Sequence, residues 1–203
     1  MNRSAFFASL ERYFGDTLDA HGATAQGVDW NSPESQELRF EQLLGLVPGG
    51  TPFSIVDYGC GYGALAGWLR SRGYEADYQG FDVSERMIQE ARALHPSRFV
   101  TREEQLEEAD YAVASGVFNL RLDVADEAWR DYIVDTVRAL DRLGRRGFAF
   151  NMLTSYSDPE RMRDDLYYGD PSFFFDHCKR AYSRNVALLH DYGLYEFTLL
   201  VRK

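Results

Sequence analysis

The sequence predicts an α/β fold with a doubly wound, mostly parallel sheet and helices on both faces. From residue 53 onward, short apolar runs typical of strands alternate with segments of helical periodicity. The first strand passes directly into the glycine-rich turn GCGYG at residues 59–63 and then into a helical pattern. The last two strands are joined only by a loop containing DYG, so we expect them to be antiparallel neighbours. A chain of 203 residues suits one such domain.

Two helices are predicted before the sheet, as an N-terminal cap over residues 1–50. The first carries apolar side chains at helical spacing, and we expect it to cover an apolar surface. These side chains are Phe6, Phe7, Leu10, Tyr13, Phe14 and Leu18. The second helix begins after Ser32, a good N-cap residue, and we expect Gly49 and Gly50 to end it. Between the two helices lies a polar loop with one large side chain, Trp30.

The central sheet is predicted over residues 51–154, and a C-terminal β-hairpin over residues 185–203. Strand patterns occupy residues 53–58, 78–82, 98–100, 111–117, 147–153, 186–190 and 195–201. Helices are expected between them at residues 65–72, 85–94 and 127–143. The second of these helices follows Ser84 as a cap and stops before Pro96.

Residues 155–184 do not fit a simple crossover between two strands. The segment is long and aromatic, with four tyrosines, three phenylalanines and an internal GDP turn. In an open parallel sheet it leaves from the carboxyl end of a strand, which is the edge where ligands bind. We therefore expect residues 155–184 to form a lid over a substrate.

Composition limits the classes of partner. The chain has 22 Lys and Arg against 32 Asp and Glu, a formal net charge of -10, which opposes a polyanionic partner such as DNA. No apolar run is long enough for a membrane span or a signal peptide, so we expect a cytoplasmic protein without a membrane partner. Cys60 and Cys178 lie in unrelated contexts, which predicts reduced thiols and no metal site.

The glycine-rich turn and the strand that follows it predict a nucleoside site. Glycines permit unusual dihedral angles and let a ligand approach the backbone closely, although a tight turn without a ligand is an equal alternative for the turn alone. Asp82 ends the next strand, about twenty residues further on, where a carboxylate can accept hydrogen bonds from two ribose hydroxyls. The turn and Asp82 together are compatible either with a dinucleotide or with a smaller nucleoside cofactor.

Two motifs resemble those of class I S-adenosylmethionine-dependent methyltransferases. VDYGCGYG resembles their first motif, V-L-D-x-G-C-G-x-G, and YQGFDVSERMIQEAR resembles their second, in which G-x-D-x-S precedes a helix. The resemblance covers about residues 53–117. It implies a single domain over residues 1–203, a seven-stranded sheet of order 3-2-1-4-5-7-6 with the last strand antiparallel, and S-adenosylmethionine as cofactor.

The resemblance also implies roles for the residues of these motifs. Asp57 would organise the turn or contact the amino group of the cofactor, Asp82 would hold the ribose, and Val83 would pack on the adenine. The glycines of the turn against the methionine part are Gly59, Gly61 and Gly63.

Three further cofactor contacts are expected outside these motifs. In some relatives an arginine upstream pairs with the cofactor's carboxylate; Arg39 is the candidate here, with a surface role as the alternative. Ser115 falls where this family positions the transferring methyl. The adenine contact after the third strand stays open between Glu103, Glu104 and Gln105, because such acidic runs are more often solvated.

The acceptor is expected beyond Ser115. The D/N-P-P-Y/F motif of amino-directed nucleic-acid methyltransferases is absent after the fourth strand. We expect five residues to bind the acceptor, namely Phe118, Asn119, Tyr156, Tyr167 and Tyr168. Candidate general bases are His190, Asp158 and Asp170, although a histidine at a strand end more often hydrogen-bonds the turn.

We therefore expect a methyltransferase that acts on an oxygen or nitrogen atom of a small polar metabolite or biosynthetic intermediate. The partner is a small-molecule acceptor, and a homodimer is allowed for. Two alternatives stay open: a regulatory module that binds the cofactor without turnover, and an RNA-directed methyltransferase.

Overall fold

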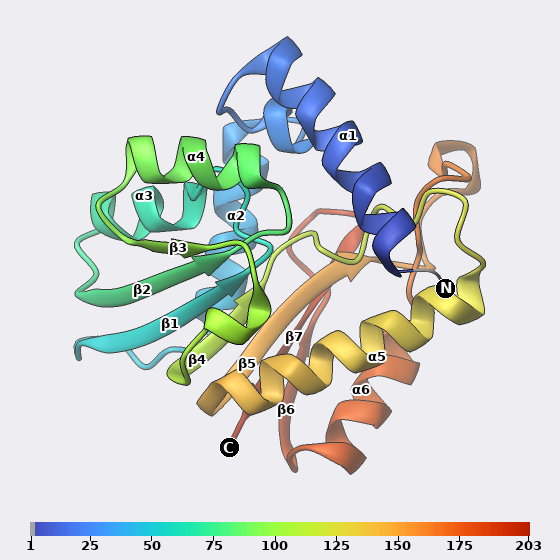
Figure 1. Cartoon of the computed structure of the whole chain (residues 1–203). Coiled ribbons are helices and arrows are strands. Elements are labelled where there is room, and N and C mark those ends of the chain that lie inside the picture. The colour runs from blue at the N-terminus through green and yellow to red at the C-terminus, as the bar shows by residue number, and fades with distance from the viewer. Residues whose placement is uncertain (1–2) are drawn as a thin grey trace.

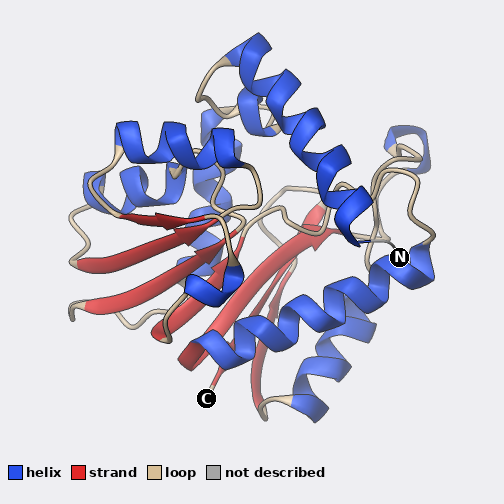
Figure 2. Ribbon diagram, viewed as in Figure 1, coloured by secondary structure: helices blue, strands red, loops and turns tan. Residues whose placement is uncertain are grey.

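The computed structural model describes residues 3–203 and has the predicted α/β architecture (Figures 1 and 2). The sheet has seven strands in the order β3-β2-β1-β4-β5-β7-β6, which confirms the expected topology. Strands β1 to β5 run parallel, and β7 is antiparallel to both β5 and β6. The strands are β1 (Phe53–Tyr58), β2 (Ala76–Phe81), β3 (Arg98–Val100), β4 (Ala109–Ala114), β5 (Gly144–Leu153), β6 (Asn185–Leu189) and β7 (Glu196–Arg202).

Within residues 3–203, six α-helices and three short 3₁₀ helices surround the sheet. They are α1 (Arg3–His21), η1 (Gln26–Val28), α2 (Pro33–Leu44), α3 (Ala64–Ser71), α4 (Glu85–Leu94), η2 (Glu103–Gln105), α5 (Asp126–Leu143), η3 (Pro159–Arg161) and α6 (Pro171–Ala181). Ser32 and Ser35 form a capping box at the start of α2, as the sequence indicated for Ser32. The expected end of α2 at Gly49 and Gly50 is wrong, because the helix stops at Leu44.

Two apolar layers cover the faces of the sheet. On one face, α5, α6 and the start of α1 pack against the strands, around the fully buried Trp129. On the other face, α2, α3 and α4 contribute Leu43, Leu65 and Ile88 to a second cluster. Because both faces are covered, the strands are buried on both sides, as parallel strands require. The carboxyl edge of the parallel strands is left for a site.

Helix α1 lies across this edge rather than along a face of the sheet (Figure 1). The ring of Phe6 packs on Trp129 at a centroid distance of 4.9 Å, which fixes the start of the helix to α5. The Tyr13 hydroxyl donates to Asp29 at 2.9 Å, and Asp19 pairs with Arg86 of α4. The helix therefore spans the opening between the two faces.

The segment expected as one lid divides into two parts. Residues 155–170 form a loop at the carboxyl edge, where the Tyr167 amide donates to the Asn119 carbonyl at 2.8 Å. Residues after it form α6, which packs on the sheet beside β6 and β7. Phe174 and Cys178 of α6 belong to the core. α6 packs as an ordinary crossover helix, because its apolar face is buried against the strands.

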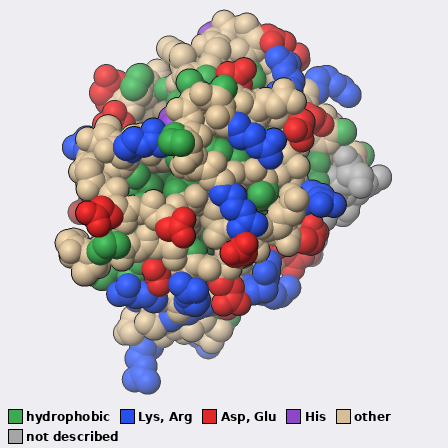
Figure 3. Space-filling view, turned by 60° about the vertical axis from the view of Figure 1, so that its left-hand side comes forward, with side chains coloured by type: hydrophobic (Ala, Val, Ile, Leu, Met, Phe, Trp, Pro, Cys, Tyr) green, Lys and Arg blue, Asp and Glu red, His purple; other side chains and the backbone are tan. Residues whose placement is uncertain are grey.

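The surface carries both signs of charge. On the face drawn in Figure 3, basic and acidic side chains are interspersed. No helix within residues 3–203 is both long enough and apolar enough to cross a membrane.

The packing of α6 predicts the effect of two neighbouring substitutions. Phe174→Ala removes a side chain that is 1% exposed and should lower the free energy of unfolding by about 3–5 kcal/mol. Phe173→Ala removes a ring that is 40% exposed and should cost less than about 1.5 kcal/mol. Urea denaturation of both variants measures the difference. Equal losses would contradict the placement of α6.

Candidate active site

A cavity of about 860 Å³ lies at the carboxyl edge of the sheet. The ends of β1, β2 and β4 form its floor, and α1, the loop before α2, α5 and the loop 155–170 contribute to its walls. The predicted cofactor residues in its wall are Arg39, Asp57, Gly59, Gly61, Asp82, Val83 and Ser115. Asn119 and Tyr168, from the predicted acceptor residues, also line it. The topology thus brings together residues that are up to 129 positions apart, from Arg39 to Tyr168.

The glycine-rich turn adopts a backbone that only glycine adopts readily. Gly59, Gly61 and Gly63 have φ values of 80°, 52° and 82°. A Cβ at residue 59 would lie 2.4 Å from Cγ2 of Val117, in the loop after β4. Gly63 lies at the start of α3 and outside the cavity wall. The turn is therefore held tightly between β1 and the loop after β4.

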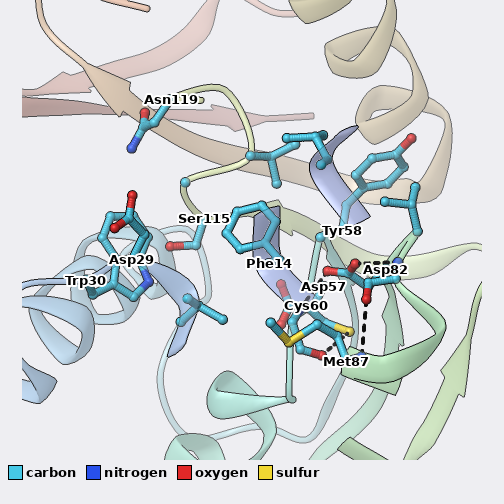
Figure 4. Close-up of a pocket in the computed structure, with 18 of the residues that line it drawn as sticks. Phe14, Asp29, Trp30, Asp57, Tyr58, Cys60, Asp82, Met87, Ser115 and Asn119 are labelled. Atoms are coloured by element: carbon cyan, nitrogen blue, oxygen red, sulfur yellow. Dashed lines mark hydrogen bonds between the residues drawn. The ribbon is translucent and has the colours of Figure 1, made fainter. Parts of the chain in front are cut away.

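Asp82 fixes this turn to the end of β2. Its Oδ2 accepts a hydrogen bond from the Gly61 amide at 2.9 Å, and its Oδ1 accepts one from the Ser84 amide at 2.9 Å (Figure 4). Burial raises the pKa of this carboxyl group, and the backbone N–H groups of Ser84, Gly61 and Val83 oppose the rise. A carboxylate has about four acceptor positions, so these donors do not use all of them. A carboxylate so placed can accept hydrogen bonds from a ribose.

Asp57 is a second carboxyl group in the floor of the cavity. It is 3% exposed, and the Tyr78 hydroxyl donates to its Oδ2 at 2.7 Å. Burial raises its pKa to about 7, the hydrogen bond from Tyr78 lowers it, and the charge of Asp82 raises it further. Any cation in the cavity would be attracted to this pair of carboxyl groups.

Glu103 is one of the three candidates for the adenine contact after the third strand, and it is already hydrogen-bonded within the protein. The Tyr58 hydroxyl donates to Glu103 Oε2 at 2.7 Å, and Arg142 donates to Oε1 at 2.9 Å. Both oxygens of Glu103 are therefore engaged within the protein. Glu104 also lines the cavity, whereas Gln105 does not.

Arg39 lies in the wall but is committed to another partner. Its Nε and Nη2 donate to the two oxygens of Glu196, at 2.9 and 2.7 Å, and Nη1 donates to the Ser35 carbonyl at 2.6 Å. Both members of the pair are buried. The alternative of a surface arginine is wrong, and a contact with the cofactor's carboxylate is left to the two remaining N–H groups.

None of the three candidate general bases lines the cavity. Asp170 caps α6 by accepting from the Ser172 amide at 2.8 Å. Asp158 accepts a hydrogen bond from the Tyr195 hydroxyl on the exposed surface. His190 is exposed, and its ring packs near Tyr156. All three lie near the ends of strands or helices, where polar side chains are common.

Three predicted acceptor residues also lie outside the wall. Phe118 is fully buried beneath it against Phe150, and Tyr167 is buried in the same core. Tyr156 points outward and is 71% exposed. The spacing of residues along the sequence cannot predict these three side-chain orientations, because they depend on how residues 115–120 pair with residues 155–170.

Sequence reasoning missed several residues that the cavity brings together. Phe14 of α1 lies between the two halves of the cavity in Figure 4, near Ser115. Trp30, Tyr195 and Glu196 also line the cavity. The helical spacing of the aromatic residues in α1 was the available signal for Phe14. The positions of the other three depend on tertiary contacts.

Comparisons with known proteins identify the family of the chain. A family model described as a methyltransferase domain matches residues 55–144. A protein of Mycobacterium tuberculosis with the name "Putative methyltransferase Rv1506c" is 54% identical over 162 residues, which span 78% of this chain and 98% of that protein.

Solved structures share the fold at low identity. The plantazolicin methyltransferase BpumL, crystallised with a pentazolic desmethylPZN analog and SAH (S-adenosylhomocysteine), has a TM-score of 0.62 and 14% identity over 97% of this chain and 98% of its own. An S-adenosylmethionine-dependent methyltransferase from Mesorhizobium loti has a TM-score of 0.55 and 19% identity over 85% of this chain and 99% of its own.

The chain belongs to the class I S-adenosylmethionine-dependent methyltransferases. It is a methyltransferase, and its cofactor is S-adenosylmethionine. The residues present fit that cofactor, because two carboxyl groups, a turn in which Gly59 and Gly61 have no side chain, and the partly buried apolar Val83 line the cavity.

Loss of the Asp82 carboxylate should abolish cofactor binding without unfolding the chain. Hydrogen bonds to a charged group contribute roughly 1.5–3 kcal/mol each, so Asp82→Ala should weaken S-adenosylhomocysteine binding by about 100-fold or more. Calorimetry with the intact protein measures the change. Asp77→Ala, at an exposed position of β2, is the matched control and should bind normally. Normal binding by Asp82→Ala would refute its role.

The raised pKa of Asp57 predicts how stability depends on pH. The folded state binds this proton more tightly than the unfolded chain, so the contribution is greatest below the unfolded pKa of 3.8 and is lost as pH rises to about 7. At about 1.4 kcal/mol for each pKa unit, the loss reaches up to about 4 kcal/mol. Urea midpoints between pH 5 and pH 8 measure it. Asp57→Asn should show a flatter profile, and an unchanged slope would contradict the assignment.

Proposed function

We propose that the chain transfers a methyl group from S-adenosylmethionine to an oxygen or nitrogen atom of a small polar metabolite or biosynthetic intermediate. One observation carries the proposal. At one end of the cavity lie Asp82 and the other residues that are predicted to bind the nucleoside part of the cofactor. At the other end lies a second group of polar and aromatic residues around Ser115 and Asn119. The two ends belong to one cavity, to whose wall α1 contributes.

The size of the cavity supports a small acceptor. Sites for small molecules occupy roughly 300–1,000 Å³, so a cavity of about 860 Å³ suits a nucleoside cofactor together with a small second ligand. Phe7 and Leu10 of α1 and Leu166 of the loop 155–170 add apolar side chains to its wall.

The charge of the wall also disfavours RNA. Eight carboxylate residues line the cavity against four arginines, and the chain as a whole carries a net charge of -10. A phosphate backbone would meet repulsion along this path. The RNA-directed alternative is therefore not adopted.

The residues of this chain are proposed to act by positioning. Asp82 would hold the ribose, the turn at Gly59 and Gly61 would let the cofactor approach the backbone, and Val83 would pack on the adenine. When bound, the cofactor supplies a methyl group on a positively charged sulfur. Transfer is an in-line displacement that alignment favours strongly. The described wall holds no histidine or lysine, so proton removal would fall to a carboxylate, a tyrosine or water.

A labelled-methyl experiment tests this function. The protein is incubated with cofactor that carries a deuterated methyl group and with a metabolite extract, and products are measured by mass. A small molecule that gains the labelled methyl with wild-type protein, and not with Asp82→Ala, is the expected result. Label found only in RNA or protein, or no transfer despite cofactor binding, would refute the proposal.

A further inference from the structure

Trp30 is held in one orientation in the half of the cavity beyond Ser115. The guanidinium of Arg39 lies over its ring at 3.9 Å from the centroid. Arg39 is itself fixed by Glu196 and by the Ser35 carbonyl. The stacked guanidinium is held by three hydrogen bonds, so it restrains the indole ring in one orientation.

The loop after β4 is shaped to accept this ring. Gly116 has a φ of 73°, and a Cβ there would lie 2.4 Å from Cζ2 and 2.5 Å from Cη2 of Trp30. Only glycine combines that backbone with so close an approach. The indole therefore lies directly against the residue that follows Ser115.

Polar groups beside the ring are few. The Ser115 hydroxyl is buried, and its Oγ has no hydrogen-bond partner among the described residues. The Asn119 amide donates to Glu196 Oε1 at 3.4 Å, and its Oδ1 accepts from the Leu153 amide. In Figure 4, Ser115 lies between Trp30 and Phe14. One free hydroxyl between two aromatic side chains is suited to a flat ligand with a hydrogen-bonding substituent.

Charge narrows the class of ligand further. Asp29 lies beside Trp30 in Figure 4, Glu11 also lines the cavity, and Arg39 is neutralised by Glu196. Two further arginines of the cavity wall lie beside carboxylates: Arg163 is paired with Asp165 at 2.5 Å, and Arg161 lies 3.9 Å from Asp158. A carboxylate or phosphate would find each of these three cations already beside a carboxylate.

We propose that Trp30 determines acceptor specificity, and that the acceptor is an uncharged, planar, aromatic or conjugated compound with a hydroxyl or amino group. The ring lies against the indole, and its substituent hydrogen-bonds to Ser115 Oγ. The S–CH₃ bond of the cofactor breaks as an O–CH₃ or N–CH₃ bond forms, the sulfonium becomes a neutral thioether, and the acceptor's proton leaves to water. This inference rests on the proposed function and narrows it.

The test uses the full chain saturated with S-adenosylhomocysteine and three probes in calorimetry. 2-Naphthol is planar and neutral, 2-naphthoate is planar and anionic, and myo-inositol is polar but not planar. We expect 2-naphthol to bind, 2-naphthoate to bind at least about tenfold more weakly, and myo-inositol not to bind. Trp30→Ala should weaken 2-naphthol binding by about tenfold and leave S-adenosylhomocysteine affinity within twofold of wild type.

Two further variants guard against a folding defect. Trp30→Phe keeps an aromatic face and should recover part of the lost affinity. Gly116→Ala should displace the indole and mimic Trp30→Ala, while the double variant should be no worse than Trp30→Ala alone. Tyr156→Ala, which removes an exposed ring outside the wall, is the matched control and should bind 2-naphthol normally.

Three results would overturn the inference. One is equal loss of S-adenosylhomocysteine affinity in Trp30→Ala, because the indole would then serve the cofactor. Another is binding of myo-inositol or 2-naphthoate as tight as that of 2-naphthol. The third is a protein that binds S-adenosylhomocysteine but not 2-naphthol. None of these outcomes affects the labelled-methyl experiment, so failure of the inference and failure of the proposed function are separable.

Discussion

The hydrogen bond from the Gly61 amide to Asp82 is the contact on which the rest of the site depends. It joins the turn after β1 to the end of β2, and the Gly59 and Cys60 amides strengthen the junction by donating to the Phe81 carbonyl. A charged acceptor makes this bond stronger than a neutral one. The cavity floor is therefore fixed in place before any ligand binds, and the cost of burying the carboxyl group is offset by the backbone donors that surround it.

Much of the fold could be predicted because its signals are local. The bounds of α4 follow from Ser84 at its start and Pro96 beyond its end, and the structure has the same helix, Glu85–Leu94. The short loop between β6 and β7 forces them to pair antiparallel. The end of α2 was less predictable, because Leu44 is followed by turn residues that the sequence pattern does not separate from the helix.

The site was predictable only where chemistry follows directly from a strand end. Asp57, Gly59, Gly61 and Asp82 stand at the carboxyl ends of β1 and β2, so topology alone gathers them. Trp30 could not be found in this way, because its place depends on contact with Gly116, 86 residues later. Aromatic composition likewise suggested a lid over residues 155–184, yet α6, in the second half of that segment, contributes Phe174 to the core.

The buried pair of Arg39 and Glu196 joins residues 157 positions apart, and this separation has a consequence for synthesis of the chain. A nascent chain contains the glycine-rich turn and the first four strands long before β7 leaves the ribosome. Until Glu196 arrives, Arg39 has no carboxylate to accept its two donors, and the indole stacked on it has no fixed support. Burying an unpaired guanidinium is costly, so this wall closes last. The chain must therefore be nearly complete before the half of the cavity beyond Ser115 takes its final shape.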